Sequence, residues 1–174
     1  MPDLGRRALC VWIAVGGLTA QAAAELAGPP ALLIPVEGVT AAQLRDNFDE
    51  RRGNSQRGHE AIDIPAPAGT PVLAVDDGFI EKLFLSTLGG NTIYQFDSSR
   101  QFTYYYAHLD RYAPGLVGGQ QVRRGTVIGY VGSTGNARQD APHLHFAVFR
   151  LGPEKQWWRG EPINPFSYLG GQTR

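Results

Sequence analysis

The sequence predicts a mainly β protein, built as a compact antiparallel β-sheet or sandwich. Glycine and proline are frequent, with 22 and 12 copies in 174 residues, and charged residues make up only 18%. This composition favours short strands and tight turns over long helices. Apolar segments rich in aromatic and β-branched residues alternate with turn-forming clusters, and we expect strands at 72–75, 79–85, 92–96, 102–109, 126–131 and 144–149. Asp97-Ser98-Ser99 is predicted to join two of them as a hairpin turn.

The first 24 residues predict a secretory signal segment. Residues 1–7 contain two arginines, residues 8–20 are apolar, and residues 22–24 are the small residues of a cleavage site. The apolar run is short for a membrane span, although an uncleaved anchor is the alternative. Cleavage would remove Cys10, the only cysteine, and leave a secreted or periplasmic chain with no stable membrane insertion.

Residues 25–47 are predicted to form an extended lead-in with one short helix. Pro29, Pro30 and Pro35 favour extended backbone, and the segment from Thr40 to Arg45 suits a helix with Thr40 as its N-cap. The main domain is expected over 48–170, followed by a tail at 171–174.

Two segments of this domain resemble each other. Residues 68–74 (AGTPVLA) and 124–129 (RGTVIG) each follow a polar loop and lead into a predicted strand. Two copies of a hairpin unit would suit a compact sandwich or barrel. Chance similarity between common strand residues is the alternative.

Charge and cysteine content exclude several classes of protein. The formal net charge is zero, so the chain lacks the basic surface that nucleic-acid binding requires. Hydrophobic residues make up 43% of the chain, which is enough for a core. A single cysteine excludes a disulfide framework, so a metal site would have to use histidines and carboxylates.

All four histidines fall in or beside predicted strands. His143 and His145 flank one residue, so on a strand they project from the same face. His59 and Asp63, four residues apart, are also predicted to share a strand face. Imidazole and carboxylate ligands suit Zn²⁺, and three protein ligands form its catalytic type of site. The sequence therefore predicts a zinc site from His59, Asp63 and one of His143 and His145, a choice that spacing leaves open.

A helical interpretation of the same segment competes with the strand. His59-Glu60 and Asp63 look like a helical H-E-x-x-H site whose second histidine is replaced, with Glu60 as general base. Pro65 and Pro67 oppose a helix there, and the isoleucines around Asp63 favour a strand. On a strand, Glu60 has the opposite parity to the ligands and is expected in solvent. Unrelated structural roles are the alternative for each histidine taken alone.

Together these motifs resemble the M23 family of zinc metallopeptidases, of the lysostaphin/LytM type. The resemblance extends over about residues 40–170. The similar segments, in family order, are 48–52 (FDERR), His59-x3-Asp63, 69–72 with 77–78, 89–91, Tyr106-Ala107-His108-Leu109, 129–136, Pro142-His143-Leu144-His145-Phe146 and 163–165.

The resemblance implies a LytM-like duplicated-hybrid-motif fold with an open groove and a specific assignment of the site. His59, Asp63 and His145 would bind one Zn²⁺, and His108 and His143 would be catalytic. Members typically hydrolyse peptide cross-links of bacterial peptidoglycan, with zinc-bound water attacking the scissile carbonyl. A D-Ala–diaminopimelate cross-link is expected, because the chain resembles Gram-negative members more than staphylolytic ones.

Some positions depart from the family pattern. Ala61 stands where the family usually has glycine, and a positive φ at this position would strain it. Asp49 stands where glycine usually follows the phenylalanine of the lead-in.

Other residues are candidates for substrate contact. Asn91, Tyr104 and Tyr106 are predicted substrate-binding residues, with a turn role for Asn91 and packing for the tyrosines as alternatives. Trp157 and Trp158 are candidates for a wall of the groove.

Two other functions compete with the peptidase. The first is a non-enzymatic LytM-type wall-binding protein that activates a separate amidase, as some relatives do after losing metal ligands; here all five metal and catalytic positions are filled. The second is a D-Ala-D-Ala carboxypeptidase of a related fold, which would need a longer spacer between His59 and Asp63. A regulatory protein partner, or a groove covered by residues 25–47, is compatible with the sequence.

Overall fold

The computed structural model describes residues 28–51 and 58–170 of the chain. The predicted signal segment, the first residues of the lead-in and the predicted tail lie outside these ranges. Within them, no helix has the length and apolar character needed to cross a membrane.

The described residues form a nine-stranded antiparallel sheet, with short 3-10 helices η1 (Ala41–Gln43) and η2 (Phe166–Tyr168) beside it. The mainly β fold class is therefore confirmed. The strands are β1 (Ile62–Pro65), β2 (Pro71–Leu73), β3 (Gly78–Ser86), β4 (Gly90–Asp97), β5 (Phe102–Tyr112), β6 (Gln121–Val122), β7 (Val127–Val131), β8 (His143–Leu151) and β9 (Gly160–Ile163).

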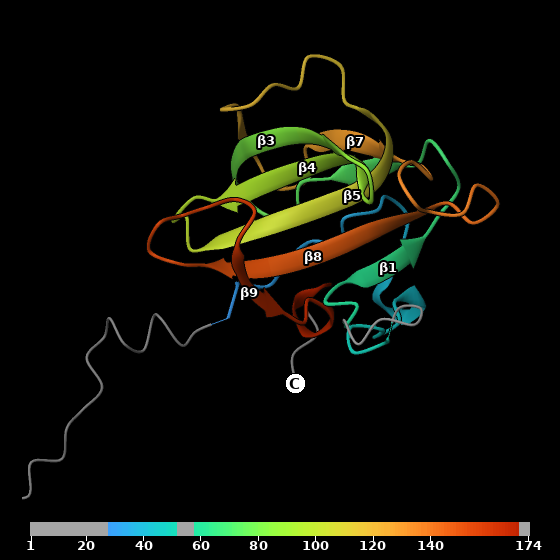
Figure 1. Cartoon of the computed structure of the whole chain (residues 1–174), viewed down its shortest axis with the longest axis horizontal. Helices are drawn as coiled ribbons and strands as arrows, with labels where there is room; N and C mark the ends of the chain where they lie inside the picture. The colour runs from blue at the N-terminus through green and yellow to red at the C-terminus, as the bar shows by residue number, and fades with distance from the viewer. Residues whose placement is uncertain (1–27, 52–57, 171–174) are drawn as a thin grey trace, which may run out of the picture.

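The long strand β5 links two parts of the sheet (Figure 1). The main part has the order β1-β8-β5-β4-β3-β6, with β9 also paired to β8, whereas β2 pairs with β7. Residues 102–107 of β5 pair with β8, and residues 109–112 pair with β7. His108 lies where β5 changes partner.

The predicted lead-in is part of the core, as far as it is described. Leu32 and Val36 are 0% and 1% exposed, and isolated bridges join them to Leu169 and Val72. Both belong to one hydrophobic cluster that includes residues of the main sheet and of the β2–β7 pair.

The short predicted helix after this lead-in forms only one turn. Thr40 starts η1, and its backbone N–H donates to Oε1 of Gln43 at 2.8 Å. Leu44 then returns to extended backbone and is buried, at 8% exposure. Burial of Leu44 ends the helix earlier than the sequence predicts.

The internal similarity corresponds to a repeated turn. Gly69 and Gly125 have φ of 85° and 84°, values that favour glycine. The Gly69 N–H donates to the Val131 carbonyl at 2.8 Å, and the Gly125 N–H donates to the Ala74 carbonyl at 2.9 Å. The two similar segments thus pair with each other as β2 and β7.

Candidate metal centre

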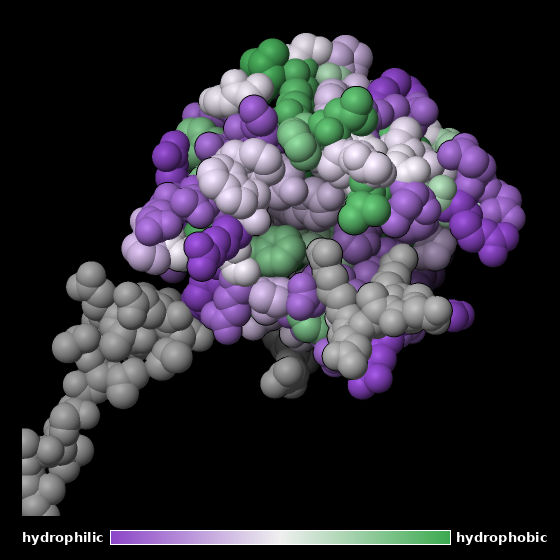
Figure 2. Space-filling model, viewed as in Figure 1, coloured by the Kyte–Doolittle hydropathy of each residue, from purple (hydrophilic) through white to green (hydrophobic). Residues whose placement is uncertain are grey.

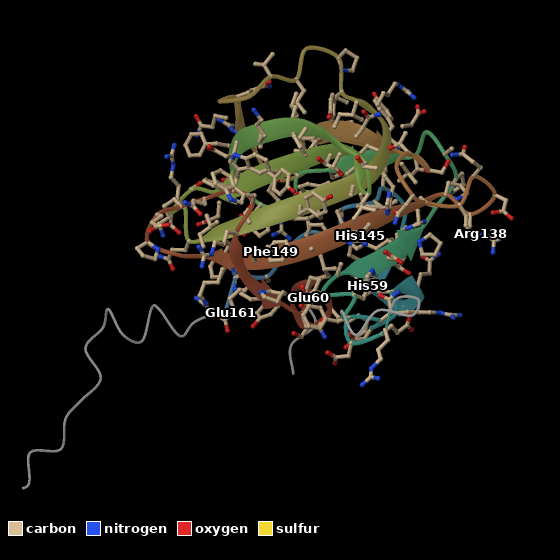
Figure 3. All side chains as sticks on the ribbon, in the orientation of Figure 1. His59, Glu60, Arg138, His145, Phe149 and Glu161 are labelled. Carbon is tan, nitrogen blue, oxygen red and sulfur yellow. The ribbon has the colours of Figure 1, made fainter. Side chains whose placement is uncertain are left out.

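Three of the predicted ligands meet at one point of the sheet. Asp63 on β1 lies directly opposite His145 on β8. Asp63 Oδ1 lies 3.1 Å from His59 Nε2 and 3.0 Å from His145 Nδ1, and the two nitrogens are 3.1 Å apart. Figure 3 shows His145 on β8 with His59 below it, beside β1.

This triangle fits a zinc ion. Zn²⁺ bound tetrahedrally at about 2.0–2.1 Å from nitrogen and oxygen has ligand atoms about 3.3 Å apart, close to the observed separations. Burial alone would raise the pKa of Asp63, but hydrogen bonds with His145 and His59 and the charge of these histidines outweigh it and lower the pKa. The carboxylate therefore stays ionised, as a metal ligand must.

His59 reaches the triangle by a route that the sequence does not predict. Strand β1 begins only at Ile62, so the predicted strand face shared by His59 and Asp63 is wrong, and so is the helical alternative. Glu60 has a φ of 54° and turns the chain between His59 and β1. Ala61 is 0% exposed and is not among the described residues with positive φ, so its backbone is not strained in the way that the sequence analysis considered. The residue with positive φ in this segment is Glu60.

Asn47 orients two of the ligands and was missed in the sequence. Its carbonyl accepts a hydrogen bond from His59 Nδ1 at 2.9 Å, which leaves Nε2 as the ligand atom. Its side-chain Oδ1 accepts the Asp63 backbone N–H at 3.2 Å. Such partners fix the tautomer and direction of metal ligands. Nothing in the local pattern around Asn47 marks this role, because its partners lie 12 and 16 residues away.

The two remaining histidines lie beside the triangle and donate from Nδ1 to backbone carbonyls. The Nδ1–H of His108 donates to the Thr134 carbonyl at 2.8 Å, and that of His143 donates to the Ala141 carbonyl at 3.0 Å. His143 Nε2 is buried, has no hydrogen-bond partner among the described residues, and lies 3.8 Å from Asp63 Oδ1. A buried acceptor left in this state is suited to a ligand or water at the centre of the site.

His108 is held in its neutral form. Burial lowers its pKa to about 4; nearby His145 and His143 contribute in the same direction, and the hydrogen bond to Thr134 opposes it. Its ring centre is 5.0 Å from that of His143 and 5.7 Å from that of His145. The unliganded imidazole of His108 can therefore act as a proton acceptor near neutral pH.

The backbone of β5 is bent to aim His108 at the site. His108 has a φ of 60°, and the register between β4 and β5 shifts beside it. The His108 N–H donates to the Gly89 carbonyl at 2.7 Å. An irregularity of this kind redirects a side chain that regular pleating would send elsewhere.

The loop that holds both histidines packs backbone against backbone on the β3–β4 hairpin. A Cβ on Gly135, whose φ is 73°, would lie 2.2 Å from the Leu88 carbonyl oxygen. A Cβ on Gly90, whose φ is 64°, would lie 2.5 Å from the Gly135 backbone nitrogen. The Asn136 N–H donates to the same Leu88 carbonyl at 2.9 Å. These contacts hold the segment that carries the Thr134 carbonyl, which sets the tautomer of His108.

The predicted substrate-binding tyrosines are not in the groove. Tyr104 and Tyr106 are both 0% exposed, so the substrate-binding prediction is wrong for them and packing is correct. Asn91 donates from Nδ2 to the carbonyls of Leu109 and Asp110, at 3.2 and 3.0 Å, and so supports the bent part of β5. Its contact with substrate stays a prediction.

A pocket of about 360 Å³ extends from the metal ligands along the sheet. Trp157 and Trp158 line it, as the sequence analysis considered. Figure 2 shows near-white and green residues over the middle and upper part of this face, with purple hydrophilic residues around the rim. The lining residues are His59, Glu60, Tyr94, Tyr105, His145, Ala147, Phe149, Trp157, Trp158, Arg159 and Gly160.

A two-histidine, one-carboxylate centre, open to a groove and accompanied by two further imidazoles, defines the class of mononuclear metallohydrolase sites. The model of peptidase family M23 matches residues 57–165. The chain therefore belongs to peptidase family M23, as its motifs suggest.

Two of the curated relatives are endopeptidases by name. The chain is 33% identical over 153 residues to an L-Ala–D-Glu endopeptidase of Bacillus subtilis, covering 84% of this chain and 45% of that protein. It is 36% identical over 117 residues to the peptidoglycan DD-endopeptidase ShyC of Vibrio cholerae, covering 65% and 26%. The chain thus spans less than half the length of these relatives.

Solved structures agree with the predicted LytM-like fold. The catalytic domain of lysostaphin from Staphylococcus simulans matches 70% of this chain and 88% of its own, at 29% identity and a TM-score of 0.59. Helicobacter pylori Csd3 matches 80% of this chain and 35% of its own, at 28% identity and a TM-score of 0.62.

Proposed function

We propose that this protein is a zinc-dependent endopeptidase that hydrolyses peptide cross-links of bacterial peptidoglycan outside the cytoplasm. The observation that carries the proposal is the complete triangle of His59, Asp63 and His145, faced by the free Nε2 of His143. The peptidoglycan substrate rests on family membership and on relatives that are named as peptidoglycan endopeptidases.

The residues of the site divide the work of hydrolysis. Zn²⁺ bound by the triangle supplies a Lewis acid for the scissile carbonyl and lowers the pKa of the attacking water. The water oxygen bonds to the carbonyl carbon, one Nε2 of His108 or His143 takes the water proton, and a proton passes to the leaving amine as the C–N bond breaks. Both Nδ1–H groups keep their carbonyl partners throughout, so either ring can carry the extra proton. The geometry does not divide the acid and base roles between them.

The amidase-activator alternative receives less support. Relatives of that kind have lost metal ligands, and this chain retains all of them in contact. Residues 28–47 of the lead-in contribute none of the residues that line the groove. A regulatory protein partner stays compatible with the proposal.

Digestion of purified sacculi tests the function. Sacculi are incubated with the chain from residue 25 onward in three samples: wild type with zinc, wild type with chelator, and the His143→Ala variant with zinc. The released peptides are identified by mass spectrometry. New peptide ends with zinc alone, at D-Ala–diaminopimelate bonds, are the expected result. Arg138→Ala is the matched control for His143→Ala. Arg138 lies exposed in the loop between β7 and β8, just before His143, and pairs with Asp140. An absence of new ends, together with stimulation of an added amidase, would replace the proposal with the activator function.

A further inference from the structure

His108 lies in a bulge of β5, at the point where this strand changes partner. Ala107 is the last residue of β5 that pairs with β8, and pairing with β7 begins at Leu109. Ala107 and His108 together stand opposite Thr92 alone on β4. The φ of His108 is 60°, and a residue other than glycine keeps such a value only where its surroundings hold it there. The direction of the His108 side chain therefore depends on contacts from outside β5.

Thr134, in the loop between β7 and β8, supports the bulge through both its hydroxyl and its carbonyl. Its Oγ1 donates to the Leu109 carbonyl at 2.7 Å and accepts the Asn91 backbone N–H at 3.0 Å. Its carbonyl accepts the Nδ1–H of His108 at 2.8 Å. Thr134 thus holds the backbone that follows His108 and also the direction of the imidazole ring.

Asn91 supports the same bulge from β4. Its Nδ2 donates to the carbonyls of Leu109 and Asp110, at 3.2 and 3.0 Å. A side-chain amide has two N–H donors, so both are used within the sheet. The Leu109 carbonyl accepts from the side chains of both Asn91 and Thr134. The two side chains therefore act on the residue directly after His108.

We propose that Thr134 and Asn91 are positioning residues for His108 in the hydrolytic reaction. Together they hold the bulge in β5 so that His108 Nε2 points to the metal centre, and neither side chain contacts the substrate. This inference rests on the proposed peptidase function. For Asn91 it replaces the predicted substrate contact with a role that acts through His108.

The expected effect on the reaction follows from the geometry of proton transfer. A group that accepts a proton must lie within hydrogen-bond reach of it. Without the Thr134 hydroxyl, the Asn91 N–H loses its acceptor and the Leu109 carbonyl loses one of its two donors. The bulge can then relax toward regular pleating, which turns the His108 ring away from the site. Misplacement of this kind lowers the rate of the chemical step by about tenfold to a hundredfold.

Two variants remove the support and a third retains it. Thr134→Val keeps the branched shape but deletes the hydroxyl, and Asn91→Asp keeps the size but replaces both N–H donors. Kinetics are measured on a soluble peptide that contains the bond identified in the sacculus digestion. Both variants should lower kcat by about tenfold to a hundredfold, with KM unchanged and one equivalent of zinc still bound. Thr134→Ser retains the hydroxyl and should have the wild-type kcat.

The tautomer of His108 provides a readout that does not depend on activity. Long-range nitrogen–proton NMR correlations of the zinc-loaded protein distinguish Nδ1–H from Nε2–H, and the His108 signals are those missing from His108→Gln. Wild type and Thr134→Ser should show the Nδ1–H form alone. Thr134→Val should show a mixture of both tautomers, because the carbonyl that accepts the Nδ1–H is no longer held in place. A general loss of stability would not change this signature.

Ser133→Ala is the matched control in the same loop. The Ser133 hydroxyl donates to Gln139 Oε1 at 3.3 Å, in an exposed contact. This variant should match the wild type in kcat, KM and the His108 tautomer. A raised KM at wild-type kcat in Asn91→Asp would indicate substrate contact and refute the positioning role of Asn91. A Thr134→Ser protein as slow as Thr134→Val would refute the role of the hydroxyl.

The positioning role and the peptidase function can fail separately. A wild-type protein that cleaves no peptide, but whose single His108 tautomer is lost in Thr134→Val, would refute the peptidase and keep the positioning role. Full activity of Thr134→Val with an unchanged tautomer would refute the positioning role and keep the peptidase.

Discussion

Removal of the Asn47 side chain should weaken metal binding without removing a ligand. Asn47→Ala keeps the main-chain carbonyl that accepts the His59 Nδ1–H, but it deletes the Oδ1 that accepts the Asp63 N–H. Asp63 lies in β1 directly opposite His145. An unpaired N–H therefore appears next to two of the three ligands, and the Asp63 carboxylate loses part of its orientation.

The magnitude follows from this single neutral hydrogen bond. A bond of this type contributes about 1 kcal/mol, which corresponds to about a fivefold increase in the zinc dissociation constant. Competition titration with a chromophoric chelator measures this constant directly. Asn47→Asp retains an acceptor at the same position, so it should keep at least wild-type affinity.

A control separates orientation of the ligands from general damage to the lead-in. Asn164→Ala removes hydrogen bonds to Asp46, the neighbour of Asn47, but it deletes no contact with a ligand. Its zinc affinity should equal that of the wild type. Equal zinc affinities for Asn47→Ala and the wild type, or an Asn47→Asp protein as weak as Asn47→Ala, would refute the positioning role.

Four further predictions concern the site and its support. His108→Ala and His143→Ala should each lower cleavage at least about a hundredfold while zinc stays bound at one equivalent by elemental analysis. Gly135→Ala should cost about 2 kcal/mol of unfolding free energy in urea, because its Cβ meets the Leu88 carbonyl at 2.2 Å; an unchanged urea midpoint would contradict the backbone packing. Ala61→Gly should lower stability by about 1 kcal/mol and leave kcat unchanged, since φ at Ala61 is not positive; a stabilised variant would show that alanine is strained there. Free zinc at 100 times its dissociation constant should add about 2.7 kcal/mol, or about 8 °C in Tm, and a chelator should reverse this shift in a thermal melt.

The ligands could be predicted because each local pattern carries its own geometry. His143 and His145 begin β8 and project together, as alternation on a strand requires. The family resemblance, not the spacing, selected His145 as the third ligand, and the triangle of ligand atoms agrees with it. For His59 the residue assignment succeeded although the local geometry was wrong, because its partners are fixed by tertiary contacts.

The prediction that Tyr104 and Tyr106 bind substrate failed for a definite physical reason. Both share sequence parity with His108, and on a regular strand all three would face the same side. The positive φ at His108 breaks that alternation, so the histidine enters the site while the tyrosines stay in the core. Tyr105, of opposite parity, is the residue of this strand that lines the pocket. A sequence pattern gives no sign of a bulge made by a residue other than glycine.

The same limit applies to residues that act through distant partners. Asn47 meets Asp63, and Trp157 meets Tyr94, only after the sheet has formed. The apolar and polar periodicity of a segment reports which face it buries, but not which segment lies opposite. Strands β2, β3, β4, β5, β7 and β8 were therefore predictable in place, whereas β6, β9 and the second layer of contacts around the metal were not.

The backbone at Glu60 connects the metal centre with the lining of the groove. A non-glycine residue with a φ of 54° stores about 1–2 kcal/mol of strain, and glycine at this position would release it. Glycine would still turn the chain and bring His59 to its ligand position, so the turn alone does not require a side chain. Glycine would, however, remove the carboxylate that lines the pocket beside His59 and His145. The same turn therefore brings His59 to its ligand position and places the Glu60 side chain in the lining of the groove.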